Sequence, residues 1–192
     1  IGAATLVDSS CAFNLQDRSN IRYNTTLEPM GAIGDVGWYN MRATVESLPP
    51  GLKLESVSSE LRRDKETGAA IGGTGELRFA GGVRSTWSCG FDAQRSSMHI
   101  HMEGKDGEIE MPGFLFQERD NSARLEVKQG DAEAKTIRIP SDKPGSALMF
   151  EDMATIAADP SLRPGWADRT RRTQALLDAI WQVGLAVEAS EG

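Results

Sequence analysis

Apolar residues recur at every second position through the middle of the chain, and this period constrains the fold more than any other feature. The pattern is clearest in Val83–Phe91 and Met98–Glu103, where apolar and polar side chains alternate. Neighbouring side chains of a strand point to opposite faces, so alternation is typical of a sheet with one buried and one polar face. Shorter segments with the same period are Leu77/Phe79, Ile109/Met111, Leu125/Val127 and Ile137/Ile139.

Turn-forming residues separate these segments. They lie at Ala80–Gly82, Gly104–Gly107 and Gln129–Asp131, and glycine adopts the backbone conformations that tight turns require. Short strands joined by tight turns predict an antiparallel meander. Residues 1–14 alternate more weakly and predict one further strand.

Three segments have helical patterns instead. The first helix is predicted over Gly31–Glu46, and the helix-breaking Pro49-Pro50-Gly51 follows it. Two more helices are predicted over Gly145–Ala158 and Ala167–Val187. We therefore predict a single α+β domain over residues 1–192, with an open, mostly antiparallel β-sheet and helices packed on one face.

The last predicted helix begins with a group of positive charges. Arg169, Arg171 and Arg172 lie in its first turns, where a cation opposes the positive end of the helix dipole. We therefore expect these arginines to have partners or to lie at an edge of the molecule.

Charge and composition argue against two classes of partner. The chain has 192 residues and a net charge of −7, whereas nucleic acid requires a concentrated basic surface. No apolar segment approaches the roughly 20 residues that span a bilayer, so no membrane partner is expected. Cys11 and Cys89 are too few and too far apart for a disulfide framework. We expect buried, reduced thiols in a cytoplasmic protein.

Three glycines at three-residue spacing open the first predicted helix. This spacing differs from that of a dinucleotide fingerprint, and no βαβ unit surrounds it, so phosphate binding is not expected. Gly31 and Gly34 would instead let the start of the helix lie close to a flat surface.

Asp35 and Tyr39 stand one helical turn apart behind these glycines. A tyrosine can exchange a proton with a carbonyl or hydroxyl group when a nearby cation lowers its pKa. A carboxylate one turn away can orient a substrate hydroxyl. The alternative is structural, with an aspartate in the first helical turn and a half-buried tyrosine, and the spacing taken alone favours this alternative.

His99 and His101 stand at strand spacing and therefore point from one face of the sheet. Two imidazoles would bind a metal ion only with a third ligand and an ordered second shell. We expect solvated histidines and predict no metal site.

The segment Gly31–Tyr39 (Gly-Ala-Ile-Gly-Asp-Val-Gly-Trp-Tyr) resembles the motif that opens the first helix of the C-terminal domain in the Gfo/Idh/MocA oxidoreductases. Other stretches agree with that family in kind and order, and the resemblance covers nearly the whole chain. These stretches are Asn20–Arg22, Ser85–Asp92, Gly104–Ile109, Phe150–Asp152 and Thr173–Ile180.

The resemblance implies a domain whose large open sheet shapes the substrate site. It assigns the substrate-orienting role to Asp35 and the role of proton donor and acceptor to Tyr39. A tyrosine here points to the glucose–fructose oxidoreductase and dihydrodiol dehydrogenase branch, and therefore to a sugar, polyol or cyclic diol as the small-molecule substrate. We expect Asn20, Arg22 and Trp38 to take part in substrate binding.

The family's N-terminal Rossmann domain, which binds NAD or NADP, has no counterpart in this sequence. Its glycine fingerprint is missing, as is its Glu-Lys-Pro segment, whose lysine is the tyrosine's cationic partner. We therefore expect a substrate-binding and oligomerisation half that is inactive alone, with its glycines close to a cofactor held by the Rossmann domain. The alternative is a non-catalytic binding or oligomerisation module. The residues of the polar sheet face predict at most a modest, hydrated homodimer: Arg84, Thr86, Ser88, His99, His101 and Glu103.

Overall fold

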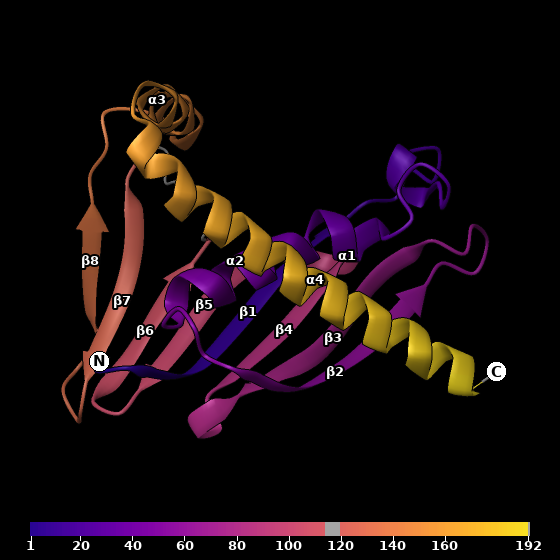
Figure 1. Cartoon of the computed structure of the whole chain (residues 1–192), viewed down its shortest axis with the longest axis horizontal. Helices are drawn as coiled ribbons and strands as arrows, with labels where there is room; N and C mark the ends of the chain where they lie inside the picture. Colours follow the sequence, from indigo (N-terminus) through magenta and orange to yellow (C-terminus); the bar gives the residue numbers. More distant parts are fainter. Residues whose placement is uncertain (114–119, 192) are drawn as a thin grey trace.

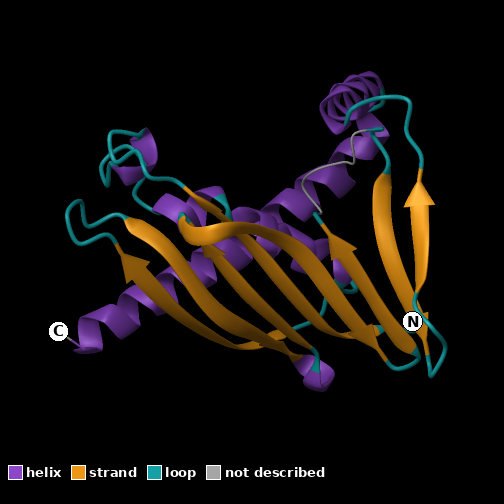
Figure 2. Ribbon diagram, turned by 180° about the vertical axis from the view of Figure 1, so that it is seen from behind, coloured by secondary structure: helices purple, strands orange, loops and turns teal. Residues whose placement is uncertain are grey.

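The computed structural model describes residues 1–113 and 120–191, which form one open sheet with helices mainly on one face (Figures 1 and 2). Within the described residues, eight strands occur in the order β2-β3-β4-β1-β5-β6-β7-β8. Their bounds are β1 Ala4–Asn14, β2 Leu54–Arg63, β3 Ala70–Phe79, β4 Arg84–Gly90, β5 Asp92–Gly104, β6 Gly107–Pro112, β7 Ala123–Gln129 and β8 Lys135–Ile139. The predicted α+β class, with an open and mostly antiparallel sheet, is confirmed.

The prediction of a simple meander is wrong at the centre of the sheet. Strand β1 inserts between β4 and β5, where it pairs parallel with β4 and antiparallel with β5. The alternation of a strand sets which face of the sheet each residue occupies but does not select the neighbouring strand. The remaining pairs are antiparallel, as predicted.

The helices are α1 Gly31–Asp35, α2 Gly37–Ser47, α3 Gly145–Ala158 and α4 Arg163–Glu191, with short 3₁₀ turns at Ile21–Tyr23, Ala80–Gly82 and Pro160–Leu162. Helix α4 crosses one face of the sheet diagonally, and α1 and α2 lie on the same face (Figure 1). On the opposite face, the described part of the chain places no helix (Figure 2). The described part of the chain has no helix with the length and apolar character needed to cross a membrane.

Helix α3 departs from the expectation that every helix packs on the sheet. It lies beyond one end of the sheet (Figure 1), and none of its residues is buried. Phe150 is 63% exposed, and Leu148, Met149 and Met153 are exposed as well. Its bounds agree with the predicted helix, so the pattern identified the helix correctly but not its packing.

The core lies between the sheet and helices α1, α2 and α4. Fully buried side chains include Ile33, Met41, Leu77, Phe91 and Ile180, and burying each stabilises the fold by about 1.5–3 kcal/mol.

Two buried polar contacts attach α2 to the sheet. Asn40 donates from Nδ2 to Ser9 Oγ at 3.0 Å, and the hydroxyls of Thr44 and Ser85 lie 2.7 Å apart. Buried polar groups without partners are costly, so these pairs favour one position of α2 on the sheet.

The cysteines agree with the prediction of buried, reduced thiols. Cys11 and Cys89 are free and buried, and they stand opposite each other on the parallel strands β1 and β4. Burial raises the pKa of each thiol to about 12, to which the charge of Asp35 contributes at Cys11. Both thiols are therefore protonated, and weak nucleophiles, at neutral pH.

Candidate functional site

The candidate site lies at the junction between α1 and α2. Asp35 is the last residue of α1, and Tyr39 lies in the first turn of α2. The predicted continuous helix is interrupted at Val36, but the local hydrogen bonds continue. The amide of Val36 donates to Ala32 O at 3.0 Å, and the amide of Tyr39 donates to Val36 O at 3.2 Å. The one-turn separation of carboxylate and phenol is therefore kept.

Gly31 allows this junction to lie directly on the sheet. Its φ is +48°, and an added Cβ would lie 2.2 Å from the carbonyl oxygen of Ala70 on β3. The prediction of a close approach to a flat surface is confirmed for Gly31. The space beside Gly31 is occupied by strand β3, and the closeness of these glycines to a cofactor held by the Rossmann domain stays a prediction. A Cβ on Gly34 would instead meet the side chain of Met30.

Arg22 forms the strongest polar contact of the site. Its Nε lies 2.6 Å from Asp35 Oδ2, and its Nη2 lies 3.2 Å from Oδ1. The hydrogen bond to Asp35 raises the pKa of Arg22, and the charges of Asp35, Glu28 and Tyr39 act in the same direction. The side chains of Arg22 and Asp35 are 38% and 28% exposed, so the pair is accessible from solvent. Arg22, Asp35 and Tyr39 thus interact electrostatically in one place.

Asn20 has a structural role next to the ion pair of Arg22 and Asp35. Its side-chain oxygen accepts a hydrogen bond from the amide of Arg22 at 3.1 Å and caps the 3₁₀ turn Ile21–Tyr23. This cap orients the backbone from which the Arg22 side chain extends towards Asp35. Substrate binding by Asn20 stays a prediction.

Trp38 supports Tyr39 from the side. The two rings meet edge to face, with centroids 5.7 Å apart and an interplanar angle of 89°. Trp38 is partly buried against the core, and the guanidinium of Arg42 lies 5.9 Å from its ring. The expected contact of Trp38 with substrate is likewise a prediction.

A cavity of about 520 Å³ opens beside Tyr39, between α2 and strands β5 and β6. Its floor is apolar and comes from the sheet: Ile100, Met102 and Met111. Its polar rim comes from α2, where Arg42 and Glu46 form an ion pair of 2.7 Å. Alternation along β5 and β6 predicts that the floor residues share one face. Their position beside Tyr39 depends on the tertiary packing of α2, which sequence reasoning missed.

His99 and His101 lie away from this site. They alternate with Ile100 along β5 and therefore point to the opposite, helix-free face. His99 lies 3.3 Å from Asp8, and His101 lies 3.0 and 3.2 Å from Glu110 and Glu103. Within the described residues, no group of His, Cys, Asp and Glu side chains could hold a metal ion.

No family model matches the chain, but solved structures share its fold. KijD10, a 3-ketoreductase from Actinomadura kijaniata in complex with NADP and TDP-benzene, matches with a TM-score of 0.78 and 20% identity, over 95% of this chain and 54% of that protein. UDP-N-acetylglucosamine 3-dehydrogenase GnnA from Acidithiobacillus ferrooxidans matches with a TM-score of 0.71 and 18% identity, over 98% and 55%. Aldose-aldose oxidoreductase from Caulobacter crescentus, complexed with glycerol, matches with a TM-score of 0.76 and 14% identity, over 97% and 55%.

These three proteins are oxidoreductases of the Gfo/Idh/MocA type. The chain has the fold found in that family. It spans about half the length of the solved structures that it matches.

Proposed function

We propose that this chain is the substrate-binding half of an NAD(P)-dependent oxidoreductase that acts on a sugar, polyol or cyclic diol. The observation that carries the proposal is the group formed by Arg22, Asp35 and Tyr39, of which Tyr39 lines a cavity, in a fold found in oxidoreductases. A carboxylate, a phenol and a cation supply the groups needed to orient a substrate hydroxyl and exchange its proton.

The described residues do not fit NAD(P) by themselves. The space that a side chain of Gly31 would fill is occupied by the backbone of β3. The segment Gly72-Gly73-Thr74-Gly75 lies inside β3, and its backbone pairs with strands β2 and β4. Neither glycine segment is free to surround a phosphate. We assign the cofactor, which accepts or donates the hydride, to an N-terminal Rossmann domain.

The chain's own residues position the substrate and handle its proton. In the direction of oxidation, the phenolate of Tyr39 takes the proton from the reacting substrate hydroxyl. In the direction of reduction, the phenol hydroxyl gives this proton to the carbonyl oxygen. Asp35, held in orientation by Arg22, accepts a hydrogen bond from a substrate hydroxyl. The floor formed by Met102 and Met111 favours a substrate with an apolar ring face, such as a deoxysugar or a cyclic diol.

The alternative of a non-catalytic binding or oligomerisation module has less support. Such a module has no need of a carboxylate and a phenol that both act on Arg22, or of a phenol that lines a cavity. Figure 2 shows the sheet face on which the described residues place no helix. The polar side chains of this face suit the hydrated homodimer contact that we keep as part of the proposal.

Titration of NADPH into these 192 residues tests the division of labour. We expect a dissociation constant weaker than about 1 mM, since no phosphate cradle is available and the net charge is −7. NADPH fluorescence or calorimetry measures it. The same chain joined to its NAD(P)-binding domain serves as the control, which should bind tightly and oxidise a sugar, polyol or cyclic diol. Micromolar binding by the 192 residues alone would contradict the assignment.

Replacing Arg22 tests the ion pair with Asp35. In the joined enzyme, Arg22→Gln should lower kcat/KM by roughly 10–100-fold, because Asp35 loses a charge-assisted hydrogen bond and its orientation. Arg22→Lys should recover part of this loss, since it keeps the charge but not the two-point contact. Steady-state kinetics measure both variants.

The matched control is Arg18→Gln, which removes another arginine of the same loop. Arg18 pairs with Asp64 at 3.0 Å and belongs to no part of the candidate site. If Arg22→Gln and Arg18→Gln change turnover equally, Arg22 has no specific role in positioning Asp35.

A further inference from the structure

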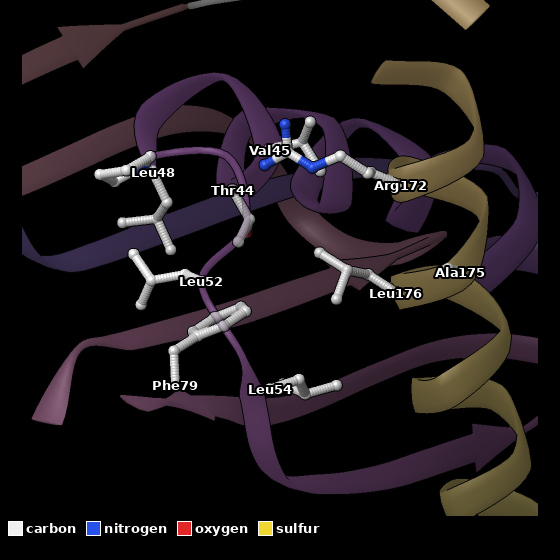
Figure 3. Close-up of a pocket in the computed structure, with 10 residues that line it drawn as sticks. Thr44, Val45, Leu48, Leu52, Leu54, Phe79, Arg172, Ala175 and Leu176 are labelled. Carbon is white, nitrogen blue, oxygen red and sulfur yellow. The ribbon is translucent and has the colours of Figure 1, made fainter. Parts of the chain in front are cut away.

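A second cavity lies on the other side of α2, between its C-terminal half and α4 (Figure 3). Its volume is about 230 Å³, and no residue that lines it also lines the cavity beside Tyr39. The walls are mainly hydrocarbon: Val45, Leu48, Leu52, Leu54, Phe79 and Leu176. Val45, Leu48 and Phe79 are buried, so at least one wall is a fixed part of the core.

Arg172 is the charged residue in this lining. Its side chain extends from α4 across the cavity, and the guanidinium ends beside Val45 of α2 (Figure 3). The side chain is only 29% exposed. Within the residues that the structure describes, it makes no hydrogen bond, and its nearest carboxylate oxygen, on Asp168, lies 3.9 Å away. The ion pair with Asp168 is long, so the guanidinium of Arg172 still has donors available for a further acceptor at the cavity.

The neighbouring arginines are accommodated differently. Arg169 lies 5.2 Å from the ring of Trp166 and 3.8 Å from Glu46. Arg171 is 75% exposed, and water can therefore satisfy its donors. Each of the three arginines therefore has an ion-pair partner, as expected. The ion pair of Arg172 is the longest of the three, and its side chain reaches over an apolar cavity.

We propose that this cavity binds a small apolar carboxylic acid, with the carboxylate on Arg172 and the hydrocarbon tail among the leucines. A planar guanidinium matches the two oxygens of a carboxylate. A methylene group takes up about as much space as a water molecule, ~30 Å³, so the cavity has room for an acid of roughly eight carbon atoms. The proposal does not depend on the oxidoreductase function.

Calorimetric titration of octanoate into the 192-residue chain tests the proposal. We expect saturable one-to-one binding with a dissociation constant below about 1 mM. Octan-1-ol, with the same tail and no charge, should bind at least about tenfold more weakly, and octylamine should not bind. The comparison of these three probes requires no substitution and therefore cannot fail through misfolding.

Two matched variants locate the site. Arg172→Met keeps most of the apolar stem but removes the charge, and should weaken octanoate binding by about tenfold or more. Arg171→Met removes a neighbouring charge that lies 3.8 Å from the same Asp168, and should leave binding unchanged. Equal binding of octanoate and octan-1-ol, equal effects of the two variants, or no saturable binding would each overturn the proposal.

Discussion

Tyr39→Phe should lower the kcat of the joined enzyme by about 10²–10⁴-fold, which is the usual contribution of a positioned proton donor. The substitution removes one oxygen atom and leaves the edge-to-face contact with Trp38. The affinity for NAD(P)H should be nearly unchanged, because the chain does not hold the cofactor in this proposal. Steady-state kinetics and cofactor titration measure the two quantities separately.

Tyr23→Phe is the matched control, because the chain contains only two tyrosines. The hydroxyl of Tyr23 donates to Leu15 O at 2.5 Å, and Tyr23 is buried. Its removal should therefore lower the free energy of unfolding by about 1–2 kcal/mol while turnover stays unchanged. A Tyr39→Phe enzyme with full turnover would mean that another group moves the proton.

The secondary structure could be predicted largely from local patterns, but the topology could not. Alternation in Met98–Glu103 identified a strand, and the broken period at Gly104–Gly107 identified a turn, because side-chain direction and turn chemistry are local properties. The parallel contact between β1 and β4 joins residues that lie more than 70 positions apart in sequence, such as Cys11 and Cys89. Such pairing depends on the packing of the whole sheet, which a period of two does not encode.

In the candidate site, too, local features could be predicted from the sequence, whereas tertiary contacts could not. The spacing of Asp35 and Tyr39 is local and predicted their shared orientation. Arg22 was predicted as a substrate-binding residue, whereas its two-point contact with Asp35 crosses from a loop to a helix and became visible only in three dimensions. The cavity floor at Met102 and Met111 could not be predicted either, because it forms where α2 lies over strands that are distant from it in sequence.

Gly31→Ala should lower the free energy of unfolding by about 3–5 kcal/mol, which is large for a single methyl group. Alanine would have to adopt a φ of +48°, and its Cβ would lie 2.2 Å from the carbonyl oxygen of Ala70. The backbone conformation alone costs about 1–2 kcal/mol, and the contact forces α1 and β3 apart. Chemical denaturation monitored by circular dichroism measures the change.

Gly81→Ala separates the two causes. Gly81 also has a positive φ, of +79°, but an added Cβ would meet nothing within 4 Å, so this variant should lose only the conformational ~1–2 kcal/mol. Equal losses in both variants would mean that the contact with Ala70 does not hold α1 in place. If the contact does hold α1, its displacement also moves Asp35, the last residue of that helix, away from Arg22. Gly31→Ala should then reduce turnover in the surviving folded enzyme, and Gly81→Ala should not.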